Sequence, residues 1–190
     1  RIIITICDVA GKGFPAALIM VMIRTILHLA AGSIRESATL LSWLNKGICD
    51  KISKDIFATV ELIVYDQNTN QILFSNAGHH PMLMFRTKNG KTYKIDSKGI
   101  PIGIETDARY GQKRINLEKG DLLVLYTDGL IEAMNENGEQ YSIEKFIDNI
   151  KEHKSLEPEP MVKEIISEIN MFVGKAKQHD DQTLMVMKIN

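Results

Sequence analysis

The sequence has few cysteines, no long apolar segment and no excess of one charge, and each shortage excludes a class of protein. The two cysteines, Cys7 and Cys49, lack a CxxC spacing, which argues against a disulfide framework and fits buried, reduced thiols in a reducing cytoplasm. The longest apolar run, 14–31, is broken by Arg24 and His28, so no membrane span is predicted, and the sequence shows no charged n-region followed by a cleavage site that would indicate a secretory signal. Basic and acidic residues number 23 and 24, and this balance gives no reason to expect a nucleic acid partner.

The length and the order of the elements predict one α+β domain. A chain of 190 residues that is 44% hydrophobic and 25% charged is typical of a single globular domain, 1–190. Strand-like and helix-like segments occur in separate runs, which favours an antiparallel β-sandwich flanked by helices. The predicted strands are 1–7, 57–66, 71–78, 81–87, 91–95, 112–117, 121–127 and 182–189, and the predicted helices are 15–31, 34–48, 142–152 and 159–173. The strands 112–117 and 121–127 are expected to pair with each other through the turn 118–120.

Three of the predicted strands have a carboxylate at one end. Asp8 follows the first strand, Asp128 follows the strand 121–127, and Asp180 and Asp181 precede the last one. A single Asp in such a place is more often a turn residue or a helix cap, and Asp180 could equally begin an Asx-turn. Three of them, brought together, would repel one another unless a hard divalent cation such as Mg²⁺ or Mn²⁺ offset the repulsion. The combination therefore favours a metal site.

Residues beside these acids have the properties that such a site needs. After Asp8 the chain reads Val9-Ala10-Gly11-Lys12-Gly13, where glycines permit a tight turn and let the Val9 carbonyl face the same ion. Gly129 is expected to adopt an unusual backbone angle just after Asp128. Lys12 could approach a substrate phosphate, although a solvated turn lysine is the commoner role. Phe14 follows Gly13, which excludes a nucleotide phosphate loop.

Five segments, in order, resemble the SpoIIE/RsbU-like phosphatases, a bacterial branch of the metal-dependent protein phosphatases (the PPM class) that include protein phosphatase 2C. The segments are DVAGKGFPAAL, AGHHPMLMF, PIGI, GDLLVLYTDGLIEAMNENGE and DDQTLMVM, and together they cover essentially the whole chain. The resemblance implies a protein phosphatase 2C-like fold and the hydrolysis of phosphoserine or phosphothreonine. The alternatives are a binding module that uses the same fold without catalysis and a metal-dependent hydrolase of small phosphoesters.

The resemblance also implies a set of metal ligands. Asp8 would bridge two Mn²⁺ or Mg²⁺ ions, with the Val9 carbonyl on one of them and Asp128 on the other. The last ligand would be Asp180, and the neighbouring Asp181 ranks below it. Water activated by the two ions would attack phosphorus directly, so no catalytic side chain is assigned beyond the ligands.

The chain departs from the family pattern in two places. Eukaryotic relatives carry a candidate general acid where this sequence has Ala10. His79 is a conceivable substitute, but a histidine at a strand end is more often a satisfied polar residue. Family members also carry a Gly-Gly-Asp motif on a strand upstream of Arg1, so the chain is expected to lack its first strand and to be weakly active or inactive. The exposed sheet edge would allow a homodimer.

The partners follow from the resemblance alone. The implied substrate is a phosphorylated STAS-domain anti-anti-sigma factor or a similar regulator of sigma factor activity. An upstream sensor or receiver region is expected in the full-length protein. The domain itself is expected in the cytoplasm, and the full-length protein could be tethered to the membrane.

Overall fold

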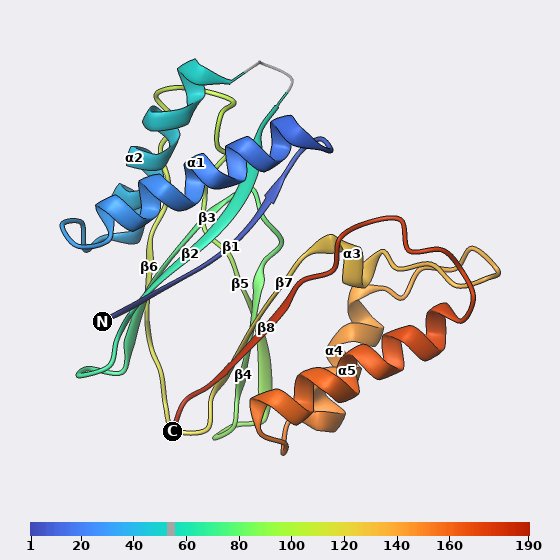
Figure 1. Cartoon of the computed structure of the whole chain (residues 1–190). Helices are drawn as coiled ribbons and strands as arrows, with labels where there is room; N and C mark the ends of the chain where they lie inside the picture. The colour runs from blue at the N-terminus through green and yellow to red at the C-terminus, as the bar shows by residue number, and fades with distance from the viewer. Residues whose placement is uncertain (53–55) are drawn as a thin grey trace. The chain divides into compact units, whose positions relative to one another are not determined.

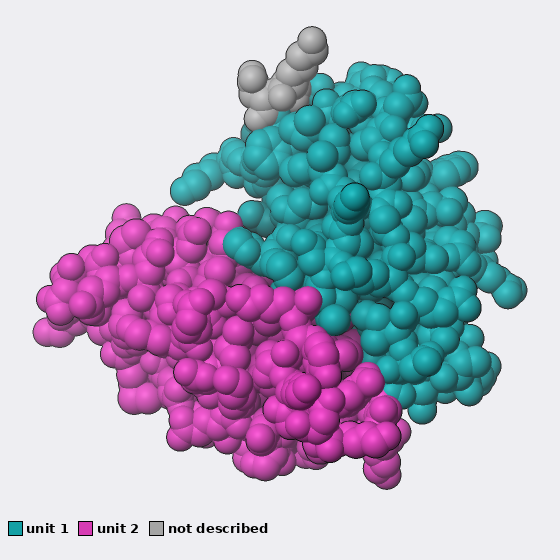
Figure 2. Space-filling view, turned by 180° about the vertical axis from the view of Figure 1, so that it is seen from behind, with its two compact units in different colours: residues 1–81, 95–117 teal, residues 82–94, 118–190 magenta. Residues whose placement is uncertain are grey.

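The chain folds into two compact units, each built on a four-stranded antiparallel sheet. The computed structural model describes residues 1–52 and 56–190. Unit 1 comprises Arg1–Pro81 and Ile95–Leu117, and unit 2 comprises Met82–Lys94 and Glu118–Asn190 (Figure 2, teal and magenta). Each unit has helices on one face of its sheet (Figure 1), so the predicted α+β class is confirmed.

Unit 1 has the strand order β1-β2-β3-β6, and two helices cover one face of this sheet. Because side chains alternate along a strand, every second residue of β2, such as Val60 and Leu62, contacts the helices. The strands are β1 (Ile2–Val9), β2 (Ala58–Asp66), β3 (Gln71–Ala77) and β6 (Lys113–Asn116), and the helices are α1 (Phe14–Ala30), α2 (Ser37–Ile48) and the 3₁₀ turn η1 (Cys49–Lys51).

Unit 2 has the strand order β5-β4-β7-β8, and the strongly amphipathic α4 and α5 cover one face of its sheet. Phe146 and Ile165 from these helices are fully buried against Val124 of β7. The strands are β4 (Met82–Arg86), β5 (Lys91–Ile95), β7 (Leu122–Tyr126) and β8 (Leu184–Lys188), and the helices are α3 (Asp128–Ile131), α4 (Ile143–His153) and α5 (Pro158–Val173).

The bounds of most predicted elements agree with the structure, with two exceptions. The second helix begins at Ser37, three residues beyond Ile34, and its N-cap residue is Glu36. The strand predicted over 1–7 continues through Val9, because Asp8 and Val9 keep pairing with β2. Asp8 is thus a strand residue and does not lie in the turn that follows. Among the described residues, no helix is both long and apolar enough to cross a membrane.

Both cysteines are free thiols that are partly buried. Burial raises the pKa of Cys7 to about 12, and the neighbouring Asp8 carboxylate adds to the shift. The Cys7 thiol is therefore protonated at neutral pH, as expected of a structural cysteine.

The strands predicted at 112–117 and 121–127 do not pair with each other. β6 pairs with β3 in unit 1, and β7 pairs with β4 and β8 in unit 2. A side-chain network in unit 2 explains the position of β7. Arg86 of β4 donates to Asp121 (3.0 Å), and the Asp121 carboxylate also accepts from the Glu118 backbone N–H (2.9 Å). This link fixes the turn before β7 to β4, an interaction between residues 35 positions apart that local sequence does not reveal.

We predict that Asp121→Ala destabilises the protein by about 3 kcal/mol, because it removes a fully buried carboxylate that serves both Arg86 and the turn. The matched control is Lys88→Gln, which breaks the exposed Lys88–Glu118 pair (side chains 75% and 39% exposed). The control should change stability by less than about 1 kcal/mol. Urea denaturation measures both variants, and equal effects would contradict the assigned role of Asp121.

Candidate functional site

The first predicted ligand, Asp8, lies near the end of β1 on the sheet face that points away from α1 and α2. In the register of β1 with β2, Asp8 is directly opposite Thr59, and Val9 is opposite Ala58. Val9 and Ala58 pack into the helix-covered core, so Asp8 and Thr59 share the other face. With the Val9 side chain buried, only its backbone is available to a ligand.

A hydrogen-bonded network on that face holds His79. The Thr59 hydroxyl lies 2.7 Å from His79 Nδ1, and Asn76 Oδ1 accepts from the His79 backbone N–H at 2.7 Å. The Asn76 amide nitrogen donates to the His79 carbonyl (2.9 Å) and to Asp96 Oδ1 (2.8 Å). Since Thr59 is opposite Asp8, the His79 ring lies on the sheet face of Asp8. His79 was predicted from the sequence, whereas Thr59, Asn76 and Asp96 were not, because their roles depend on strand register.

The turn from Val9 to α1 has the geometry expected of its glycines. Gly11 and Gly13 have φ of 108° and 77°, values that favour glycine over any other residue. The Ala10 backbone N–H donates to the Phe57 carbonyl (2.8 Å), which fixes the beginning of the turn. Lys12 lies between the two glycines with its side chain exposed.

In unit 2, the Thr127-Asp128-Gly129 and Asp180–Thr183 segments are packed together. Two hydrogen bonds join Thr127 and Thr183: the Thr127 N–H donates to the Thr183 carbonyl (3.1 Å), and the Thr183 N–H donates to Thr127 Oγ1 (2.9 Å). The Thr127 hydroxyl also donates to the Asp181 carbonyl (3.1 Å). The Gln182 side chain donates to the Gly129 carbonyl (3.0 Å). Asp128 and Asp180 therefore belong to one small region, although 51 residues separate them in the chain.

Gly129 is required here for a reason that the sequence prediction did not give. Its backbone is helical in α3 and has no positive φ, so the expected unusual backbone angle is wrong. A Cβ atom at this position would overlap the Asp181 carbonyl oxygen, and it would lie 3.0 Å from the carbon of the same carbonyl. Glycine is needed because the peptide of Asp181 passes directly against α3.

The carboxylates of this region differ in exposure. Asp128 is half-buried at the first position of α3, whereas Asp180 and Asp181 are exposed. Asp180 Oδ1 accepts from the Asp181 N–H (2.8 Å), and the Gln178 side chain donates to the Asp180 carbonyl (2.7 Å). The Asp180 carboxylate bonds to the next residue and not to the residue two positions on, so this bonding is not the Asx-turn that was the alternative for Asp180, although it orders the backbone beside the carboxylate.

The structure thus brings the Asp128 motif and the Asp180 motif together, while the Asp8 motif belongs to the other unit. Asp8, Val9, Lys12 and His79 lie in unit 1, and Asp128, Gly129, Asp180 and Asp181 lie in unit 2. Within the described residues, no group of three or more His, Cys, Asp or Glu side chains is arranged to hold a metal ion. The convergence of Asp8 with Asp128 and Asp180 therefore stays a prediction.

The residues present fit a hard divalent cation in their chemistry. The candidate donors are carboxylate and carbonyl oxygens, which suit Mg²⁺ and Mn²⁺. The absence of a side chain at Gly129 lets the backbone carrying Asp180 lie against the backbone carrying Asp128. A side chain at position 129 would push the backbone segment of Asp180 away from that of Asp128.

We predict that Gly129→Ala destabilises the protein by about 1–3 kcal/mol, because the new methyl group collides with the peptide of Asp181. The matched control is Gly32→Ala, where a Cβ meets nothing within 4 Å and no positive φ opposes it. This control should cost nothing and could add up to about 1 kcal/mol. Urea denaturation distinguishes them, and an unaffected Gly129→Ala would show that the close approach is unimportant.

Comparison with known proteins identifies relatives over the whole chain. The family model described as Stage II sporulation protein E (SpoIIE) matches residues 1–190. Phosphoserine phosphatase RsbU of Bacillus subtilis (strain 168) is 33% identical over 187 residues, which is 97% of this chain and 55% of RsbU. The chain therefore spans about half the length of that relative.

Solved structures with the same fold include phosphatase 2C domains. The SiaA-PP2C domain of Pseudomonas aeruginosa has a TM-score of 0.83 at 21% identity, covering 99% of this chain and 76% of that one. RsbX in complex with magnesium has a TM-score of 0.68 at 17% identity, covering 97% and 79%. The expected protein phosphatase 2C-like fold is confirmed. Because the family model covers every residue and RsbU matches nearly all of them, the chain belongs to the SpoIIE family of RsbU-like phosphatase domains.

Proposed function

We propose that this chain is the phosphatase domain of a metal-dependent protein serine/threonine phosphatase. The observation that carries the proposal is the packing of the Asp128 motif against the Asp180 motif through Gly129, within a chain of the SpoIIE family. A chain that had kept only the fold would have no need of two ordered acidic motifs in contact. The substrate would be phosphoserine or phosphothreonine on a regulatory protein, as the name of the RsbU relative suggests.

The proposed ligands for two Mn²⁺ or Mg²⁺ ions are Asp8, the Val9 carbonyl, Asp128 and Asp180. RsbX, which shares the fold, has been solved with magnesium, and this supports a metal requirement. When bound, such ions supply a water of lowered pKa and neutralise charge on the phosphoryl oxygens. Asp181 contributes its carbonyl to the contact with Thr127, which suits a supporting role better than ligation.

Other residues of the chain would serve the substrate. His79, whose Nδ1 lies 2.7 Å from the Thr59 hydroxyl, is a candidate for the general acid that eukaryotic relatives carry at the position of Ala10. Lys12, exposed between two glycines, could meet a phosphoryl oxygen. The Asn76 bonds hold the His79 backbone in place on both sides, which reduces the cost of ordering the ring.

The biological setting is part of the same proposal. The substrate would be a phosphorylated STAS-domain protein, and the signal would arrive from a sensor or receiver region of the full-length protein. The match covers only 55% of RsbU, so the rest of that relative is long enough to include such a region. We further propose that residues 1–190 act as one domain, which lies in the cytoplasm.

We predict that Asp128→Asn abolishes turnover of phosphoserine protein and leaves the folded structure intact. The amide keeps the size of the side chain but removes the negative charge that a metal ligand needs. Turnover with Mn²⁺ is measured beside the circular dichroism spectrum and the urea midpoint. Asp107→Asn, at an exposed acid outside the five segments, is the matched control, and retained turnover in Asp128→Asn would disprove its role as a ligand.

We predict that the full-length protein hydrolyses a phosphoserine STAS-domain protein only with Mn²⁺ or Mg²⁺, and that chelation abolishes the activity. The assay is run in parallel with p-nitrophenyl phosphate. Hydrolysis of the small ester alone would indicate a phosphatase of small esters. Hydrolysis of neither substrate, with the phosphoprotein still bound, would favour the non-catalytic binding module.

A further inference from the structure

A cavity of about 260 Å³ lies beside the Asp180 motif, entirely within unit 2. Its walls come from α3 with the residues after it, from the C-terminal end of α5, and from the loop 176–182. The volume is below the roughly 300–1,000 Å³ typical of sites for cofactors and drug-sized ligands. It suits a single amino-acid side chain.

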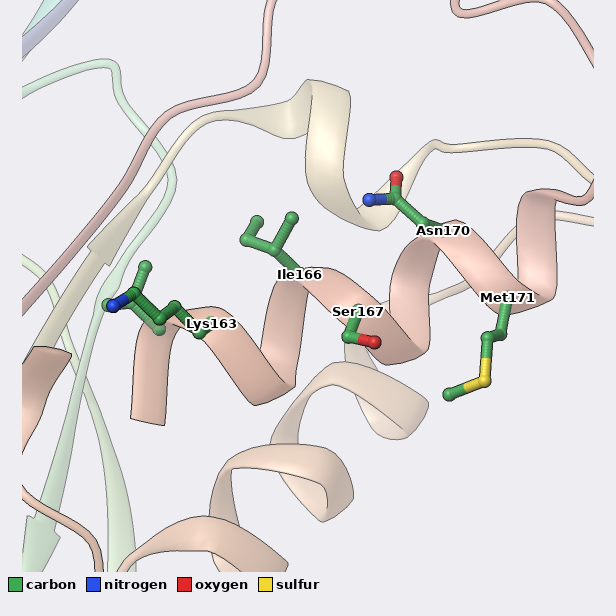
Figure 3. A pocket seen from close by; sticks show the side chains of 6 residues that line it. Lys163, Ile166, Ser167, Asn170 and Met171 are labelled. Carbon is green, nitrogen blue, oxygen red and sulfur yellow. The ribbon is translucent and has the colours of Figure 1, made fainter. Parts of the chain in front are cut away.

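The cavity shares residues with the proposed phosphatase site. Gly129, Asp180 and Gln182 line it, and all three belong to the two motifs that contact each other. A phosphoserine held beside Asp180 would therefore place a neighbouring residue of its own chain at the mouth of the cavity. A second hollow in unit 2 is different, because its walls come from α5 alone (Figure 3) and include no residue of either motif.

The lining combines an apolar part with one positive charge. Ala133 and Val173 provide apolar wall, and Lys177 provides an ammonium group. Within the described residues, Lys177 forms no ion pair, unlike Lys151, Lys163 and Lys188. The one acid in the lining is Asp180, which the proposed metal site would use. A glutamate matches this combination, with methylene groups for the apolar wall and a carboxylate for the ammonium.

We propose that this cavity is a specificity subsite for the substrate protein. It receives an acidic side chain that is next in sequence to the phosphoserine or phosphothreonine. The inference rests on the proposed function and adds the substrate feature that the site selects. Lys177 acts as a binding residue for the flanking acid and takes no part in the chemical step. Its removal therefore weakens substrate binding and leaves the turnover of bound substrate unchanged.

The test uses the full-length protein with Mn²⁺ and a set of phosphoserine peptides. Each peptide carries a single Glu at one of the positions that flank the phosphoserine, and a matching peptide carries Gln at the same position. We expect the Glu peptide to be preferred at one position, and Lys177→Gln to raise its KM about 3- to 10-fold with kcat unchanged. The variant should not alter KM for the matching Gln peptide, and the preference should decrease in high salt.

The matched control is Lys175→Gln, because Lys175 is an exposed lysine two residues before Lys177 that does not line the cavity. Equal KM values for the two variants, or a wild-type protein indifferent to Glu and Gln, would overturn the subsite. Hydrolysis of p-nitrophenyl phosphate reports separately on the proposed function, and all three proteins should show it at the same rate. Its absence in the wild type would overturn the proposed function and the subsite with it.

Discussion

The contact between Gly129 and the peptide of Asp181 is the constraint on which the candidate site depends. Two peptide backbones lie so close there that no side chain fits between them. Thr127 and Gln182 complete the contact with hydrogen bonds to backbone groups. The positions of two acidic motifs are thereby set by main-chain packing, which is stiffer than a link through long side chains. Everything proposed for unit 2, from metal ligation to the subsite at Lys177, uses this arrangement.

Unit 1 achieves a similar result by a different route. Its candidate residues are fixed by strand register, which places Asp8 opposite Thr59, and by the double hydrogen bond from Asn76 to the backbone of His79. Asn76 is almost completely buried, and a buried amide is tolerated only when its polar atoms have partners. The network therefore stabilises the fold and orders the site with the same bonds.

Much of the fold could be predicted from the sequence, because local patterns determine where strands and helices begin and end. The pairing of the strands was harder to predict than their positions. Segments 112–117 and 121–127 look like a hairpin in sequence, yet the link from Arg86 to Asp121 assigns the second strand to the sheet of β4. The acids were singled out as carboxylates at strand ends, and the family pattern supplied their proposed roles as ligands. The need for Gly129 was predicted for the wrong reason, since sequence shows which residue is small but not what approaches it.

The division of the chain into units has a consequence for how the protein is made. The β4–β5 hairpin belongs to unit 2, but the chain returns to unit 1 before β7 is reached. During synthesis the hairpin is complete well before β7, the strand that pairs with β4, because β6 is synthesised between them. A hairpin alone is marginally stable in water. Its apolar residues, Leu83 and Phe85 among them, have no β7 to pack against until that strand is synthesised, and exposed apolar strands of this kind favour aggregation.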